Sequence, residues 1–284
     1  MMEQRHVLSL GLGGFHRVAY TQWGDPKNPR VLLAVHGLTR NGRDFDALAR
    51  ALSGTFRVVC PDIVGRGDSD RLTDKGQYGY PQYCADMTAL IARLDATELD
   101  WLGTSMGGLI GIMIAARPNN PIRRLILNDI GPSIARGGLE RLAGYVGRDP
   151  RFAYRAEAEA YFRRVMATFG PLDDGHWAHV VDHGIEPAEQ GGYRLRYDPA
   201  IGEAFKGPLF DIELWPFWNP IACPVLAIRG AESDLFLEST ARRMAETGPK
   251  AEIVSLPGIG HAPALMADDQ IALVREWLAK TRTE

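Results

Sequence analysis

The chain has 284 residues, of which 45% are hydrophobic and 24% are charged, the proportions of an ordinary globular protein. This composition excludes a disordered chain, a collagen-like chain and a coiled coil. Its 32 lysines and arginines stand against 35 acidic residues, and the net charge of -3 gives no excess of cations for capturing nucleic acid or anionic lipid. We therefore expect neither nucleic acid nor a membrane as a partner.

The cysteine pattern and the N-terminus indicate a reducing compartment. Cys60, Cys84 and Cys223 are odd in number and widely spaced, with no CxxC pair for zinc or redox chemistry. The first ten residues lack the apolar stretch of a secretory signal. The longest mostly apolar run, residues 101–116, contains several glycines and is shorter than the ~20 residues that span a bilayer. We expect reduced thiols and a cytoplasmic location.

Most of the chain predicts alternating strands and helices after an N-terminal hairpin. Continuous apolar runs bounded by turns indicate buried strands, whereas apolar residues at helical spacing indicate helices. On these patterns strands are expected at 6–10, 16–23, 30–36, 56–62, 99–103, 123–129, 224–230 and 251–256, and helices at 44–52, 83–94, 105–116, 238–247 and 268–280. This order is typical of an α/β fold, a mostly parallel, doubly wound sheet with helices on both faces.

The alternation is interrupted in the middle of the chain. Residues 131–220 have no convincing buried strand, include a helical stretch at 157–168, and hold six of the ten phenylalanines and three of the six tryptophans. Large aromatic side chains line many small-molecule pockets. We therefore expect a core formed by residues 1–130 and 221–284, with residues 131–220 inserted as a helical cap.

The strongest chemical motif is Gly103-Thr104-Ser105-Met106-Gly107, at the junction of a predicted strand and a predicted helix. The residue at the apex of such a turn has a strained backbone and an exposed side chain. Glycines two positions before and after it are needed because a Cβ atom there would collide with the turn. We therefore predict that Ser105 is a nucleophile; the alternative is a glycine-rich helix contact.

A serine hydroxyl is a weak nucleophile at neutral pH and needs a base to take its proton. His261 lies in a glycine-rich loop, residues 257–263, directly after the strand expected at 251–256. Loops at the carboxyl ends of strands carry the active sites of α/β folds. We predict that His261 is the base.

The base needs a carboxylate that orients it. Asp129, Glu232 and Asp234 all lie in loops that follow predicted strands. Asp234 precedes His261 in the order serine, aspartate, histidine, which is the chain order of triads built on this kind of sheet. We favour Asp234, with Asp129 and Glu232 as the alternatives.

The remaining histidines invite a metal interpretation. His176, His179 and His183 have i, i+3 and i+7 spacing, which places them on one helical face. No carboxylate or cysteine pattern in the sequence completes a ligand set, so we predict histidines that face solvent and no metal. We also expect no organic cofactor. His6 and His16, on the N-terminal hairpin, are likewise expected to face solvent.

Taken in order, the motifs resemble the α/β-hydrolase superfamily over essentially the whole chain. They are His36-Gly37 after the third strand, Asp62 to Ser69 after the fourth, the turn at Ser105, and the loops of Asp234 and His261. The resemblance implies an α/β-hydrolase fold in which Ser105, Asp234 and His261 form the catalytic triad.

The resemblance also assigns roles around the nucleophile. It implies an oxyanion hole formed by the backbone N–H groups of Leu38 and Met106, with Gly37 allowing close approach of the substrate. His36 becomes a structural residue in place of a base. An aspartate stands at the apex of the turn in haloalkane dehalogenases and epoxide hydrolases, so Ser105 excludes both of these activities.

The chain is similar to bacterial cytoplasmic carboxylesterases, some of which act on oligoesters of short hydroxy acids and on polyesters such as polylactide. We therefore predict a serine carboxylesterase with a small-molecule ester substrate, active as a monomer or homodimer. Arg40 and Trp218 are expected to contact the substrate together with Gly37, although a solvated loop arginine is an alternative for Arg40. The competing functions are carbon–carbon bond hydrolysis of the meta-cleavage type, cofactor-free haloperoxidase chemistry, and ligand recognition without turnover.

Overall fold

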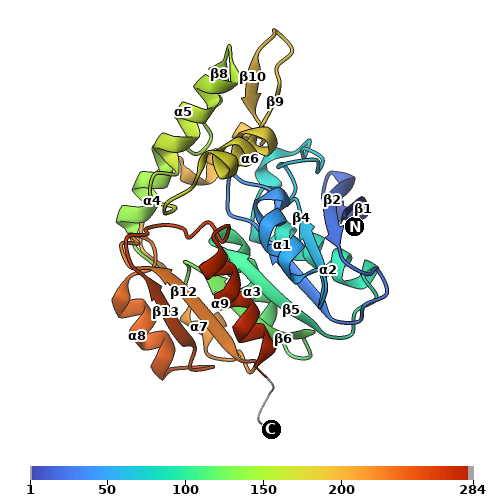
Figure 1. Ribbon diagram of the computed structural model, residues 1–284, viewed down its shortest axis with the longest axis vertical. Helices are drawn as coiled ribbons and strands as arrows, with labels where there is room; N and C mark the ends of the chain where they lie inside the picture. Colours follow the sequence, from blue (N-terminus) through green and yellow to red (C-terminus); the bar gives the residue numbers. More distant parts are fainter. Residues whose placement is uncertain (1, 281–284) are drawn as a thin grey trace.

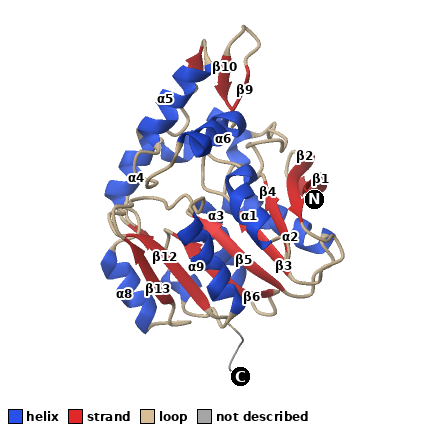
Figure 2. Ribbon diagram, in the orientation of Figure 1, coloured by secondary structure: helices blue, strands red, loops and turns tan. Residues whose placement is uncertain are grey.

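The computed structural model describes residues 2–280, and its central feature is one eight-stranded sheet (Figures 1 and 2). The strand order is β1-β2-β4-β3-β5-β6-β12-β13. The strands are β1 (Met2–Gly11), β2 (Gly14–Trp23), β3 (Val31–Val35), β4 (Arg57–Pro61), β5 (Leu99–Thr104), β6 (Ile122–Asn128), β12 (Val225–Gly230) and β13 (Glu252–Leu256). Strand β2 pairs antiparallel with β1 and β4, and the remaining pairs are parallel. The predicted doubly wound α/β fold is confirmed.

Helices cover both faces of the sheet, as the continuous apolar strands require. Helices α1 (Asp46–Leu52) and α9 (Asp268–Ala279) pack on one face. Helices α2 (Tyr80–Arg93), α3 (Met106–Ala115) and α8 (Glu238–Glu246) pack on the other. Single turns of 3-10 helix, η1 (Gly42–Phe45) and η2 (Lys75–Gln77), precede α1 and α2. No helix among residues 2–280 has both the length and the apolar character needed to cross a membrane.

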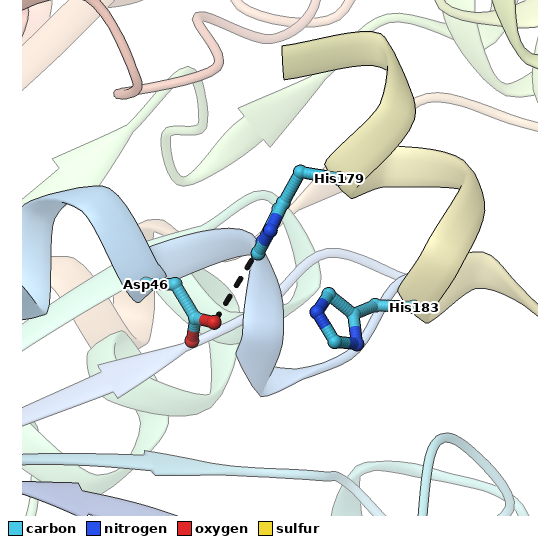
Figure 3. A group of neighbouring side chains, drawn as sticks. All are labelled: Asp46, His179 and His183. Carbon is cyan, nitrogen blue, oxygen red and sulfur yellow. Dashed lines mark ion pairs between the residues drawn. The ribbon is translucent and has the colours of Figure 1, made fainter. Parts of the chain in front are cut away.

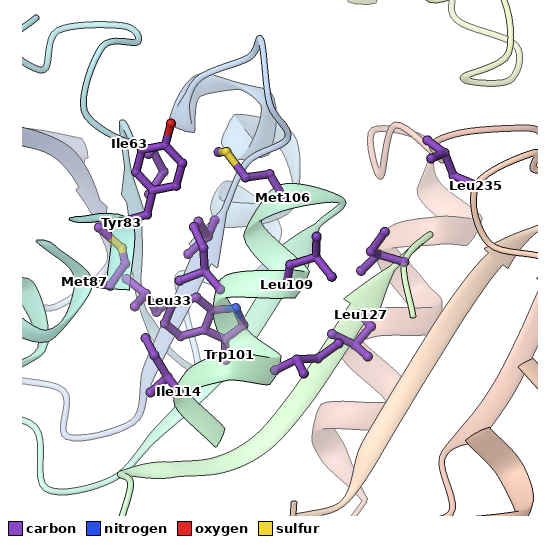
Figure 4. Close-up of a cluster of buried hydrophobic side chains, with 14 of the residues drawn as sticks. Leu33, Ile63, Tyr83, Met87, Trp101, Met106, Leu109, Ile114, Leu127 and Leu235 are labelled. Atoms are coloured by element: carbon purple, nitrogen blue, oxygen red, sulfur yellow. The ribbon is translucent and has the colours of Figure 1, made fainter. Parts of the chain in front are cut away.

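Trp101 lies at the centre of the larger core, on the central strand β5 and under α3 (Figure 4). Its side chain is fully buried, and the indole Nε1–H donates to the carbonyl oxygen of Gly107 at 3.0 Å. Figure 4 shows Leu33, Met87 and Leu127 around the ring. The core therefore fixes the first turn of α3, which includes Met106 and Gly107 of the Gly103–Gly107 motif.

Most of the segment between β6 and β12 forms a separate layer of helices above the carboxyl ends of the strands (Figure 1). It contains α4 (Arg136–Ala143), α5 (Arg155–Val165), α6 (Asp174–Gly184), η3 (Pro199–Phe205) and α7 (Trp215–Trp218). Its strands are two or three residues long and form two small sheets: β7 (Ser133–Ile134), β8 (Arg151–Phe152), β9 (Ile185–Pro187), β10 (Tyr193–Leu195) and β11 (Ile212–Glu213). These strands do not join the main sheet. Helix α7 lies within the range expected for the cap but packs against α3.

One local expectation for the hairpin is wrong. His16 is buried, and its Nε2 lies 2.9 Å from a carboxylate oxygen of Asp86, which is itself fully buried in α2. The helix packs along β1 and covers this side of the hairpin, so His16 does not reach solvent.

Candidate active site

Ser105 occupies the sharp turn between β5 and α3, with φ 51° and ψ -114°. A Cβ atom on Gly103 would lie 2.3 Å from the carbonyl carbon of Gly107, and one on Gly107 would lie 2.1 Å from the carbonyl oxygen of Val35. Both distances are far inside van der Waals contact. The predicted need for glycine on each side of the apex is confirmed, because Gly103 lies against the first turn of α3 and Gly107 against the end of β3, and only a hydrogen atom fits at each place.

Ser105 and His261, which the sequence places 156 residues apart, meet above the sheet. The Nε2 atom of His261 lies 2.9 Å from the Ser105 hydroxyl oxygen. The Nδ1 atom lies 2.7 Å from a carboxylate oxygen of Asp129. A carboxylate only accepts hydrogen bonds, so the proton of a neutral imidazole belongs on Nδ1 and the lone pair of Nε2 faces the serine.

The carboxylate of Asp129 is completely buried and is held by three donors. One oxygen accepts from the Gly230 backbone N–H at 2.6 Å, and the other accepts from the Ser233 hydroxyl at 2.6 Å as well as from His261. The residue directly follows β6 and has a φ of 55°. A side chain held in this way keeps one orientation and keeps the imidazole in one tautomer.

Asp234 does not orient His261, so that prediction is wrong. Its carboxylate accepts from Nε and Nη2 of Arg141 at 2.6 and 2.9 Å, and its side chain is 41% exposed. The hydrogen bond from Arg141 also lowers the pKa of Asp234. Strand β6 lies directly beside β5, the strand that precedes Ser105, whereas β12 lies one strand further away. The loop after β6, which carries Asp129, therefore starts closer to Ser105 than the loop after β12, which carries Asp234. Glu232, the other alternative, is exposed.

A buried arginine contacts both residues that are expected to form the oxyanion hole. The Arg66 guanidinium donates to the carbonyl oxygen of Leu38 at 2.9 Å and lies 3.7 Å from the sulfur of Met106. It also donates to the Tyr83 hydroxyl at 3.0 Å. In the sequence, the one signal for Arg66 is its position within the segment from Asp62 to Ser69 that resembles the family. The oxyanion roles of Leu38 and Met106 themselves stay predictions.

His36 is a structural residue. Its Nδ1–H donates to the Gly37 carbonyl oxygen at 2.7 Å, and its Nε2 accepts from the Ile63 backbone N–H at 2.9 Å. Complete burial lowers its pKa from 6.5 to about 3, and the nearby cation of Arg66 acts in the same direction, although the bond to Gly37 opposes the shift. The neutral imidazole therefore connects the loop after β3 to the loop after β4.

The pKa of His36 predicts a loss of stability in mild acid. Between about 6.5 and about 3 the unfolded chain binds this proton and the folded chain does not, so the free energy of unfolding falls as the pH drops through that window. His36→Gln, whose amide oxygen can accept from Ile63, should flatten this dependence. Urea unfolding of both proteins at about pH 7.5 and about pH 5 measures the difference. If the free energy of unfolding changed by the same amount between the two pH values in both proteins, His36 would not be the source of the dependence.

Two cavities open beside Ser105. The larger, about 210 Å³, is mostly apolar, and its walls include Tyr80, Leu109, Ile130, Leu139, Phe205 and Leu209. The smaller, about 50 Å³, has walls that include Gly37, Arg40, Tyr145, Met166, Phe169 and Ala262. Leu38, Ser105 and Leu142 belong to both. An ester whose carbonyl carbon sits at Ser105 can thus extend in two directions, with more room on the apolar side.

The residues predicted to contact the substrate have different outcomes. Gly37 and Arg40 line the smaller cavity, but the Arg40 guanidinium is paired with Asp44 at 2.6 Å and lies over the Phe162 ring at 5.2 Å. The prediction for Trp218 is wrong. Its side chain is completely buried where α7 packs against α3, its Nε1–H donates to the Thr247 carbonyl oxygen at 3.1 Å, and it lines neither cavity at Ser105.

The inserted segment also supports the histidine loop. The Thr168 hydroxyl donates to the carbonyl oxygen of His261 at 2.6 Å, and the Thr168 carbonyl oxygen accepts from the Gly260 N–H at 2.8 Å. The Asn41 amide, in the loop after β3, donates to the His183 carbonyl oxygen at 2.7 Å. Hydrogen bonds therefore connect the inserted segment to two loops of the core, the one that carries Asn41 and the one that carries His261.

The fold and the arrangement of Ser105, His261 and Asp129 define a class of protein, and sequence comparison agrees with it. The profile of the alpha/beta hydrolase fold matches residues 30–266. The chain belongs to the α/β-hydrolase family.

Individual relatives cover nearly the whole chain. A 3-hydroxybutyrate-oligomer hydrolase from Cupriavidus necator is 43% identical over 280 residues, which is 95% of this chain and 96% of the relative. The crystal structure of a Rickettsia typhi protein superposes with a TM-score of 0.93 at 32% identity and covers 99% of this chain and 100% of that one. An alpha/beta hydrolase from Novosphingobium aromaticivorans gives 0.86 at 35% identity and covers 98% of each chain.

Proposed function

We propose that the chain is a serine esterase that hydrolyses oligoesters of short hydroxy acids, with 3-hydroxybutyrate oligomers as the substrate class. The observation that carries the proposal is the hydrogen-bonded series Ser105–His261–Asp129, whose serine lines a mostly apolar cavity. The activity named for the relative at 43% identity supports the choice of substrate class. Polylactide oligomers have the same ester chemistry and are a second substrate to test.

The geometry supports acyl transfer through Ser105. His261 takes the hydroxyl proton as the serine oxygen attacks the ester carbonyl, and the carboxylate of Asp129 stabilises the imidazolium that forms. The N–H groups of Leu38 and Met106 are assigned to the developing oxyanion, with Met106 at the N-terminus of α3. His261 then protonates the leaving alcohol, and the acyl group remains on Ser105.

A second half-reaction releases the acid. Water enters beside His261, loses a proton to Nε2 and attacks the acyl carbonyl. The bond between the acyl carbon and the Ser105 oxygen then breaks, the acid leaves, and the serine oxygen takes the proton back from His261. Apart from water, every step uses groups of the chain itself, and we assign no cofactor to the reaction.

We further propose that residues 131–220 act as a cap over the cavities and that the protein is a monomer or homodimer. We also propose that it is cytoplasmic, in keeping with the free thiols of Cys60 and Cys84.

Hydrolysis by the wild-type protein and by Ser105→Ala tests the proposal. The substrates are 3-hydroxybutyrate dimer and trimer, a polylactide emulsion, and p-nitrophenyl esters from acetate to dodecanoate. We expect turnover of the hydroxy-acid oligomers, and a loss of about 10⁴-fold or more in kcat for the alanine variant because the nucleophile is missing.

Circular dichroism and thermal melting serve as the control that the variant is folded. A folded Ser105→Ala protein with wild-type kcat would overturn the proposal. Failure of the wild-type protein on every ester would also overturn it, and would favour carbon–carbon hydrolysis or ligand recognition instead.

A further inference from the structure

Three metal-binding side chains meet where the inserted segment rests on the core (Figure 3). His179 and His183 lie one turn apart on α6, and their rings are 4.5 Å apart between centroids. Asp46 is the first residue of α1. One donor atom from each of the three lies within 4.8 Å of the other two. The carboxylate that the sequence pattern lacks is supplied from a helix 133 residues earlier in the chain.

This donor set suits a borderline divalent cation. Two imidazoles and one carboxylate form a common three-ligand zinc set that leaves a further position for water. Zinc bonds of about 2.0–2.2 Å imply donor separations of roughly 3.4 Å in a tetrahedral site. His179 Nε2 and the nearer Asp46 oxygen are 3.8 Å apart, so a small movement brings them to this separation. Coordination also requires that Nε2 give up its hydrogen bond to the Arg43 carbonyl oxygen, with the ring proton placed on Nδ1.

The second histidine is ready to coordinate. The His183 ring forms no hydrogen bond or ion pair with another residue in the described range 2–280. No existing hydrogen bond of this ring has to break when a cation binds.

Arg43 is the competitor for this site. Its guanidinium pairs with the Asp46 carboxylate at 2.5 Å, and its carbonyl oxygen lies 2.8 Å from His179 Nε2. The Arg43 side chain is 26% exposed and can turn toward solvent, whereas Asp46 is only 5% exposed. A cation at the site would therefore replace the charge of Arg43 next to the same carboxylate.

We propose that Asp46, His179 and His183 form a divalent-cation site of the zinc type that joins helix α6 of the inserted segment to helix α1 of the core. The inference is independent of the ester chemistry at Ser105. A bound cation would connect two elements that are far apart in sequence and stabilise the seated position of the inserted segment.

Calorimetric titration of the full chain with Zn²⁺, after removal of metal with EDTA, tests the site. We expect one zinc ion per chain in the wild-type protein, at least about tenfold weaker binding in His183→Asn and in His179→Asn, and a melting temperature that rises with zinc only when both histidines are present. His176→Asn is the matched control, because His176 lies on the same helix but faces Asp173 at 3.0 Å. Absence of binding, or equal binding by His183→Asn, would overturn the proposal.

A second variant tests the role of Asp46 without removing it. Arg43→Gln takes away the competing guanidinium and keeps the backbone carbonyl, so zinc affinity should increase by about tenfold. Unchanged or weaker affinity in this variant would show that Asp46 is not a ligand. Circular dichroism of each variant establishes that it is folded, and none of these readouts uses ester hydrolysis.

Discussion

Asp129→Asn is expected to lower kcat for hydroxy-acid esters by about 10⁴-fold, whereas Asp234→Asn should keep it within a factor of about two. An amide at Asp129 donates toward Nδ1 of His261 or leaves it without a charged partner, so the imidazole takes the wrong tautomer and its protonated form is no longer stabilised. Steady-state kinetics of the two variants beside the wild-type protein give the comparison.

Both substitutions replace one carboxylate oxygen by an amide nitrogen. A difference in kcat between the two variants therefore shows which aspartate acts on His261. Asp234 is paired with Arg141 at the surface, where such an ion pair contributes about 0–1 kcal/mol to stability and lies outside the series of bonds to Ser105. If Asp234→Asn instead lost the activity and Asp129→Asn kept it, the triad assigned from the structure would be wrong. Thermal melts of both proteins exclude unfolding as the cause.

Gly107→Ala is expected to destabilise the protein by about 3 kcal/mol or more and to remove activity with it. The added Cβ would lie 2.1 Å from the carbonyl oxygen and 2.6 Å from the carbonyl carbon of Val35, and 2.9 Å from the carbonyl oxygen of His36. These are backbone atoms at the end of β3 and cannot move aside as a side chain can. Urea unfolding gives the change in the free energy of unfolding.

Gly137→Ala is the control for this substitution. Gly137 also lies in the first turn of a helix, α4, but an added Cβ would have no atom within 4 Å apart from its chain neighbours and the adjacent backbone of its own helix. Since alanine has the higher helix propensity, we expect unchanged stability or a gain of up to about 1 kcal/mol. Similar losses in both variants would mean that the close approach of α3 to β3 is not the cause.

Local patterns in the sequence were enough to predict Ser105 and His261. Each of these residues is defined by a strand that ends and a glycine-rich turn that follows, and both signals lie within about ten residues of chain. The orienting carboxylate is not local. Asp129 and Asp234 both fall between Ser105 and His261 in the chain, so chain order fits either of them. The choice depends on which strand lies beside β5, and pairing between strands is a property of the assembled sheet.

The difference between local signals and contacts of distant segments also explains why the sequence did not predict the positions of Asp46 and Trp218. The spacing of His179 and His183 on one helix is visible in the sequence, but the position of Asp46 beside them depends on how α6 rests on the core. Trp218 belongs to a segment rich in aromatic residues, and composition alone did not show that α7 returns to pack against α3. Contacts between distant segments decided both cases.

The bonds between Thr168 and the histidine loop have a consequence for the timing of turnover. Thr168 belongs to the inserted segment, yet it supports the backbone of His261 and Gly260. Any movement of this part of the segment that widens the way to Ser105 also withdraws that support from the base. If the segment moves in this way during turnover, admission of substrate and proton transfer are successive stages of one cycle, and we expect the rate at which the segment reseats to set an upper limit on kcat.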